Sequence, residues 1–158
     1  MEQLAKENQL KFENYREQFK RMNKALANGF NLEAIFIEYA LMEDRTESIL
    51  RHADLWSAYT NSRKGNMPTI DSKIRYIKKH AENKKNPLHK YFSDDLLEQV
   101  LIWKEERNRL IHALIKQHLT NEDVIRIAQN GRELTRKVRT RTTSYNRIIS
   151  TCKSTKPM

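Results

Sequence analysis

The sequence predicts an all-α protein, folded as an up-and-down bundle of about five helices. Apolar residues recur at steps of three and four along most of the chain, and no segment alternates polar and apolar residues with the period of a strand. Only three glycines and three prolines occur in 158 residues, and five of these six lie between the periodic segments or near the C-terminus. Because few breakers allow few turns, we expect long antiparallel helices.

The first two helices are predicted from their apolar faces and their ends. The first ends before Gly29, and the second begins with Asn31 as its N-cap and continues to the basic loop 60–69. The apolar face of the first helix comprises Phe12, Tyr15, Phe19, Met22 and Leu26. That of the second comprises Ile35, Tyr39, Met42, Ile49, Ala53 and Trp56.

The remaining three helices have start signals of their own. The third begins near Asp71 and ends in the segment 83–92. Ser93, which two aspartates follow, is expected to cap a fourth helix that runs to about His118. Thr120 and Asp123 resemble a capping box and open a fifth helix. Its apolar face comprises Val124, Ile127, Leu134, Val138, Tyr145 and Ile149.

The length fits a single domain, expected at residues 1–150, followed by a basic tail at 151–158. Cys152 is the one cysteine, which excludes an internal disulfide and a cysteine-based zinc site and favours a reducing compartment. No apolar run reaches the ~18 residues that span a bilayer, and the N-terminus lacks the pattern of a secretion signal. We therefore expect a cytoplasmic protein that does not contact a membrane.

The net charge of +10 is unevenly distributed. Residues 63–92 hold nine basic residues against two acidic ones, and residues 131–158 hold eight against one, so each block carries +7. A polyanion such as RNA would be attracted to these blocks. The candidate nucleic-acid-binding residues, all in the fifth helix, are Arg132, Arg136, Lys137, Arg139 and Arg141. A solvated basic face, or a site for an acidic protein, would explain the same charges.

The fourth helix carries an arginine within an apolar stripe. At ~100° per residue, Arg107 projects from the middle of this stripe. The other members of the stripe are Leu96, Val100, Trp103, Leu110 and Leu114. His112 lies ~140° from Arg107 in azimuth and ~7.5 Å from it along the axis, so the two side chains straddle a broad face and could reach one site.

The order Arg107, four intervening residues and His112 resembles the motif of the HEPN superfamily, the "higher eukaryotes and prokaryotes nucleotide-binding" helical bundles. The signature of that family is an arginine, four to six residues and then a histidine on a late helix. Many members have Asn, Asp or His directly after the arginine, and Asn108 fits that pattern. Two other pairs have suitable spacing but no such residue after the arginine. They are Arg45 with His52 and Arg75 with His80.

The resemblance implies a metal-independent endoribonuclease that needs no cofactor and uses the RNA 2′-hydroxyl as internal nucleophile. His112 would be the general acid/base, and Arg107 would bind the scissile phosphate. Asn108 would orient the histidine or a phosphate. Members usually act as homodimers whose paired motifs line one cleft. Some members have a tyrosine two positions after the histidine, where this chain has Leu114, so no such tyrosine role is expected.

Three further residues are expected to support this site. Lys104 lies beside the stripe of Arg107 and could add positive charge. A buried arginine also favours a carboxylate partner, and Glu38 or Glu43, at the edges of the apolar face of the second helix, is expected to orient Arg107. In the alternative interpretation, Arg107 belongs only to a structural ion pair of the bundle.

Together these observations favour a HEPN-like, metal-independent endoribonuclease of a bacterial-type defence or toxin system. RNA, a second copy of the chain and an antitoxin or other protein are the expected partners. The alternatives are a non-catalytic RNA- or nucleotide-binding module of the same fold and a structural adaptor whose basic face meets an acidic protein. No Gly-rich phosphate loop, metal-ligand spacing or serine-nucleophile motif occurs in the sequence, so no metal site is expected.

Overall fold

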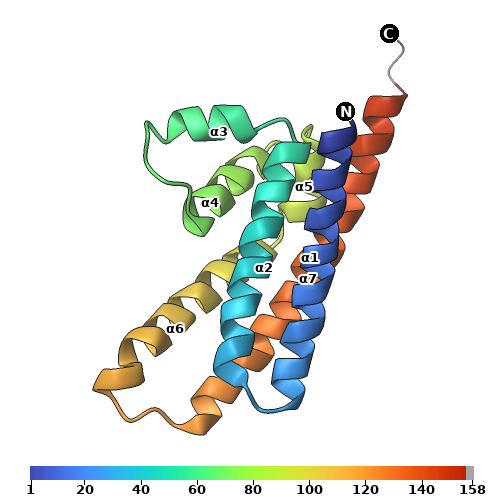
Figure 1. The fold of residues 1–158 in the computed structure, drawn as a ribbon. Coiled ribbons are helices and arrows are strands. Elements are labelled where there is room, and N and C mark those ends of the chain that lie inside the picture. The colour runs from blue at the N-terminus through green and yellow to red at the C-terminus, as the bar shows by residue number, and fades with distance from the viewer. Residues whose placement is uncertain (156–158) are drawn as a thin grey trace.

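The computed structural model describes residues 1–155 and confirms the all-α class. This part of the chain forms seven helices and no strand. The helices are α1 (Glu2–Ala27), α2 (Asn31–His52), α3 (Trp56–Ser62), α4 (Ile70–Ala81), α5 (Pro87–Phe92), α6 (Leu96–Lys116) and α7 (Asn121–Ser154). In Figure 1, α1, α2 and α7 run side by side, whereas α6 diverges from them toward its C-terminal end.

Helices α2 and α7 form the centre of the bundle, because they make its most extensive helix–helix contact. Helix α1 packs mainly on α2, and α6 packs mainly on α7. Arg139 of α7 lies over the Phe19 ring of α1, whereas Arg126 of α7 pairs with Glu106 of α6. These two arginines are ~140° apart around the α7 axis. Helices α1 and α6 therefore lie on opposite flanks of α7.

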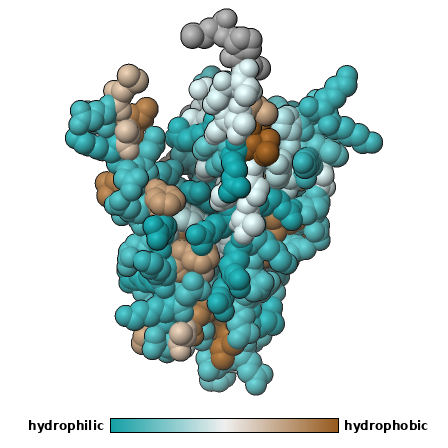
Figure 2. Space-filling view, turned by 90° about the vertical axis from the view of Figure 1, so that its right-hand side faces the viewer, coloured by the Kyte–Doolittle hydropathy of each residue, from teal (hydrophilic) through white to brown (hydrophobic). Residues whose placement is uncertain are grey.

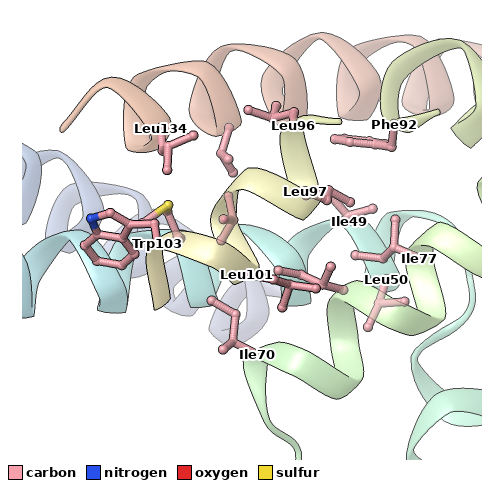
Figure 3. Close-up of a cluster of buried hydrophobic side chains, with 14 of the residues drawn as sticks. Ile49, Leu50, Ile70, Ile77, Phe92, Leu96, Leu97, Leu101, Trp103 and Leu134 are labelled. Carbon is pink, nitrogen blue, oxygen red and sulfur yellow. The ribbon is translucent and has the colours of Figure 1, made fainter. Parts of the chain in front are cut away.

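The apolar core lies where α2, α4, α5, α6 and α7 meet. Trp103 of α6 is completely buried, and its indole N–H donates a hydrogen bond of 2.9 Å to the carbonyl of Ile127 in α7. Figure 3 shows the hydrophobic side chains that these helices direct toward one another. Those labelled beside Trp103 are Ile49, Leu50, Ile70, Ile77, Phe92, Leu96, Leu97, Leu101 and Leu134. A smaller cluster of Tyr15, Met22 and Leu41 holds α1 on α2.

Helices α2 and α7 approach each other closely at Gly131. A Cβ atom at this position would lie 2.0 Å from Oε2 of Glu38 and 2.7 Å from Cζ2 of Trp103. Glycine inside a helix costs about 1 kcal/mol relative to alanine. Glycine is nevertheless required at position 131, because only a hydrogen atom fits between the α7 backbone and these two buried side chains.

Helix α1 ends as predicted, in a turn that glycine permits. Gly29 has φ +76°, and the N–H of Phe30 donates to the carbonyl of Ala25 at 2.8 Å, which satisfies a free carbonyl of the last turn. This turn places Phe30 in the N-cap position of α2, so the prediction of Asn31 as N-cap is wrong by one residue. Asn31 is instead the first helical residue, and its side-chain amide donates to the Gly29 carbonyl at 3.3 Å.

The second predicted helix is interrupted, which is one reason why the structure has seven helices and not five. Helix α2 ends at His52, and Asp54 takes the left-handed conformation with φ +58°. The N–H of Leu55 then donates to the carbonyl of Leu50 at 2.9 Å, the same type of closure that follows α1. Trp56, predicted to belong to the second helix, therefore begins the separate helix α3.

The segment 83–92 was expected only to end a helix, but it contains α5. Asn86 caps this helix by accepting from the N–H of Leu88 at 3.0 Å, and Pro87 occupies the first helical position, where its missing N–H costs nothing. Ser93 is the C-cap of α5, and Asp95 occupies the N-cap position of α6. The prediction that Ser93 caps the fourth helix is therefore wrong.

The start of α7 confirms the prediction, because the hydroxyl of Thr120 accepts from the N–H of Asp123 at 3.3 Å. Helix α7 continues to Ser154, so residues 151–154 of the expected tail are helical, and residues 156–158 lie outside the described residues. Among the described helices, none combines the length and the apolar character needed to cross a membrane.

We expect Gly131→Ala to lower the free energy of unfolding by about 2 kcal/mol, because the added methyl group overpacks the contact with Glu38. Urea denaturation measures this change. Asn130→Ala is the matched control, because Asn130 is exposed on the same turn of α7 and alanine favours a helix. Equal stability of Gly131→Ala and the wild type would contradict the close approach.

Candidate functional site

Helix α6 carries the predicted site on its second half, where the helix diverges from the bundle (Figure 1). Trp103 anchors the first half in the core. Arg107 and Asn108 are half-buried, and His112 is exposed. The site therefore lies at the edge of the bundle, open to solvent, and not in a dry core.

Two aromatic rings of α2 hold the side chain of Arg107. The guanidinium carbon of Arg107 lies 4.5 Å from the centre of the Tyr39 ring and 5.2 Å from that of Phe36. A guanidinium over an aromatic face at such distances gains about 0.5–2 kcal/mol, more when the contact is desolvated. These rings thus fix the position of Arg107 without neutralising its charge.

The hydrogen-bonding capacity of Arg107 is largely unused. Its Nη1 donates to Oδ1 of Asn108 at 3.0 Å, whereas its Nε–H is buried and has no acceptor in the described part of the chain. No ion pair of Arg107 with a carboxylate occurs within residues 1–155. A guanidinium fork of this kind can bind the oxygens of a phosphate group.

The two glutamates expected to orient Arg107 have other surroundings. Glu43 forms an ion pair with Lys73 at 3.5 Å. Glu38 is completely buried, and its carboxyl lies against Gly131 of α7. Burial raises the pKa of Glu38 to about 9, although the charge of Arg132 lowers it somewhat. At neutral pH the Glu38 carboxyl is therefore protonated, and a neutral acid cannot serve as the counter-ion of Arg107.

Lys104, expected to add charge to the site, is neutralised locally. Its ammonium group donates to both carboxylate oxygens of Asp71 at 2.7 Å and pairs with Glu105 at 2.7 Å. Burial alone would lower the pKa of Lys104, but the hydrogen bonds to Asp71 and Glu105 outweigh burial and raise it. Lys104 therefore stays protonated and joins α6 to α4.

Burial and the charges of Glu43, Arg107 and Lys104 all affect the pKa of the Tyr39 hydroxyl. Burial raises its pKa, and the charge of Glu43 adds to this effect, while the charges of Arg107 and Lys104 oppose it. A tyrosine with a raised pKa keeps its proton at neutral pH. Tyr39 thus contributes an aromatic face and a hydroxyl donor beside Arg107, and it carries no charge.

His112 lies on the same helix as Arg107, five residues farther on. Its imidazole is exposed and forms no hydrogen bond with the described residues. An exposed imidazole is accessible to a substrate and can serve as a general acid or base. Because His112 lies on an open surface of the chain, a closed site around its imidazole requires a second molecule.

The basic residues predicted on the fifth helix lie on two flanks of α7. Arg141 pairs with Asp94 and donates to the carbonyl of Tyr91 at 3.2 Å, so it supports the fold on the α6 flank. Lys137 is exposed and lies on the same side, in a shallow groove with Tyr91. The other three predicted residues, Arg132, Arg136 and Arg139, line a groove between α1 and α7, and Arg136 also borders the groove of Lys137.

Sequence reasoning missed the aromatic support of Arg107. Phe36 lies outside the apolar face predicted for the second helix, and Tyr39 was assigned to that face as a core residue. The available signal was their spacing of three residues, which places both rings on one side of α2. In the described chain, no group of three or more His, Cys, Asp or Glu side chains is placed to hold a metal ion.

Comparison of the sequence and the structure with known proteins gave no match to a family model, to a characterised protein or to a solved structure.

The buried Glu38 predicts a specific dependence of stability on pH. Its pKa is about 9 in the folded state against an ordinary value of 4.5, so between pH ~5 and ~9 folding requires a proton that the unfolded chain has released. The free energy of unfolding should therefore fall as pH rises through this window, by up to about 1.4 kcal/mol per pH unit.

Urea denaturation of Glu38→Gln across the same pH range tests this dependence. The variant keeps a neutral side chain of similar shape, so its stability should lack the downward slope that Glu38 contributes. Glu133→Gln is the control, because Glu133 is exposed on α7 and its removal should leave the slope in place. Parallel curves for wild type and Glu38→Gln would contradict a protonated buried carboxyl.

Proposed function

We propose that this protein is a HEPN-like, metal-independent endoribonuclease of a bacterial-type defence or toxin system, with the catalytic residues Arg107, Asn108 and His112. The observation that supports this proposal is the state of Arg107. Two aromatic rings fix its guanidinium, no carboxylate of residues 1–155 neutralises it, and an exposed imidazole follows five residues later on the same helix. A purely structural arginine would be expected to form an ion pair.

The reaction needs these side chains, the RNA itself and one further acid that protonates the leaving group. The imidazole of His112 accepts the proton of the ribose 2′-hydroxyl, the 2′-oxygen forms a bond to phosphorus, and the bond between phosphorus and the 5′-oxygen breaks. The 5′-oxygen leaves with a proton from an acid, so the products are a 2′,3′-cyclic phosphate and a 5′-hydroxyl. Arg107 binds the non-bridging oxygens and stabilises their developing charge.

A homodimer would supply the missing acid, because the second copy brings another His112. Three exposed apolar side chains near the site favour such a contact: Phe36 is 49% exposed, Leu114 is 40% exposed and Ile115 is 97% exposed. Exposed apolar side chains near a polar site can mark a surface for association. In this arrangement the Arg107 and His112 side chains of both copies face one shared cleft.

A second candidate function is non-catalytic, namely an RNA- or nucleotide-binding or protein-interaction module that uses the basic faces. The position of Arg132, Arg136 and Arg139 in one groove favours it, because this groove could hold an anionic partner without any chemistry at α6. An antitoxin or another acidic protein belongs to the same class of partner.

Cleavage of end-labelled single-stranded RNA in EDTA tests the enzymatic proposal. We expect the wild type to produce 2′,3′-cyclic phosphate ends and to leave a substrate with a 2′-deoxyribose at the scissile position intact. His112→Ala and Arg107→Ala should each reduce the cleavage rate by about 100-fold or more, because each removes a group that acts in the transition state.

Arg109→Ala and His118→Ala are the matched controls for this assay, because both residues are exposed and lie close to the site along the chain. Their cleavage rates should equal that of the wild type. Wild-type rates for His112→Ala, or no cleavage by the wild type itself, would leave the non-catalytic function as the better proposal.

The proposed dimer makes a separate prediction for two isoleucines of α6. Ile115→Asp should convert a dimer into a monomer in sedimentation velocity and should lower the cleavage rate, because a charge then replaces an apolar contact beside the site. Ile102→Asp is the control, since Ile102 is also exposed, at 56%, but lies ~140° around the helix from Ile115. A wild-type protein that sediments as a monomer under assay conditions contradicts the shared cleft.

A further inference from the structure

A second site lies away from Arg107, in a groove of about 610 Å³ between α1 and α7. Helix α1 contributes Phe19 and Asn23, and α7 contributes two threonines, a serine and four arginines. We call this site the arginine groove, after Arg132, Arg136, Arg139 and Arg147. Figure 2, which views the molecule from the side where α1 and α7 lie in Figure 1, shows a largely hydrophilic surface with scattered apolar residues.

The positive charge of the arginine groove is almost uncompensated. None of the residues that line it is acidic. Within the described part of the chain, only Arg136 of the four arginines has a carboxylate within 4 Å, and that pair with Glu133 is long, at 3.8 Å, with both side chains more than half exposed. Exposed pairs of this kind contribute little. The groove therefore presents four guanidinium groups to an anionic ligand.

The arrangement of these groups is linear. The arginines follow one another along α7 at separations of four, three and eight residues, and Thr143 occupies the turn between Arg139 and Arg147. From Arg132 to Arg147 the helix rises about 22 Å. This length exceeds what one phosphate group can contact, so it fits an extended chain of phosphates.

The shape of the groove favours a single strand over a duplex. A groove between two neighbouring helices can enclose one extended chain, whereas the phosphates of a duplex lie on a convex surface that would touch only its rim. The ring of Phe19 is covered by the guanidinium of Arg139, whose carbon lies 4.3 Å from the ring centre, so this ring is not available to stack on a base. The groove provides guanidinium and hydroxyl donors, which bind the oxygens of the nucleic-acid backbone and do not distinguish one base from another.

We propose that the arginine groove binds the sugar–phosphate backbone of single-stranded nucleic acid, with no preference for sequence. An acidic protein fits less well, because stable protein interfaces bury an apolar centre and this groove contains one aromatic residue under an arginine. The groove lies on the α1 flank of α7, opposite the α6 flank. The proposal rests on residues other than Arg107 and His112, so it holds whether or not the chain cleaves RNA.

Binding of a fluorescent oligouridylate of about 12 nucleotides, followed by anisotropy across a salt series, tests this proposal. The full-length chain carries His112→Ala, so that cleavage cannot change the probe. The groove variant combines Arg132→Gln, Arg136→Gln and Arg147→Gln, three exposed residues whose replacement should not disturb folding. We expect its affinity to fall at least about tenfold and the slope of log K against log salt to decrease by about 2, because each phosphate contact contributes ~0.7.

A second triple variant separates local contact from overall charge. It combines Arg75→Gln, Lys79→Gln and Arg126→Gln, which remove the same charge from exposed positions on α4 and on the α6 flank of α7. This control should bind as its parent does, and oligodeoxyuridylate should bind within a few-fold of the RNA. Equal losses in both triple variants, tighter binding of a duplex, or displacement of the probe by polyglutamate at equal charge would each overturn the proposal.

Discussion

The close approach of α2 and α7 at Gly131 is the constraint on which the arrangement of the other helices depends. Because position 131 has no Cβ, the carboxyl of Glu38 and the indole of Trp103 can both lie against the α7 backbone. The hydrogen bond from Trp103 to Ile127 holds α6 on one flank of this central pair, while α1 packs on the other flank. The same contact thus separates the two candidate sites, since Arg107 projects from α6 and the arginine groove faces α1.

Periodicity was sufficient to predict the longer helices, and the errors occurred where single residues decide how a helix begins or ends. Gly29 was recognised as a helix end because glycine favours a left-handed conformation. Asp54 adopts the same conformation after α2, but a single aspartate within a helical pattern does not predict this conformation. For this reason α2 and α3 were predicted as one helix. The sequence contains two start signals for α5, Asn86 as N-cap and Pro87 at the first helical position, yet this helix spans only six residues, too few for a periodic pattern.

The sequence predicted the position of Arg107 in the bundle better than the contacts of its side chain. The apolar stripe identified Arg107 as an exception, and the structure does place it, half-buried, at a helix–helix contact. The expected partner was a carboxylate, whereas Phe36 and Tyr39 hold the guanidinium by their ring faces. A helical pattern indicates which face of α2 a residue occupies, but it does not indicate which helix packs against that face. For this reason Glu38 was predicted to orient Arg107, whereas its carboxyl lies against Gly131 of α7.

The two candidate sites should differ in their response to salt because they differ in exposure. The arginines of the groove are mostly exposed, so ions screen them over a Debye length of about 10 Å at 0.1 M salt. Arg107 is half-buried against two aromatic rings, where screening is weaker. If both proposals hold, the groove determines how strongly RNA is captured, whereas Arg107 and His112 determine what happens to one phosphate. A strand held on the α1 flank must then pass around the central helix pair, or reach the Arg107 of a second copy, before it can react.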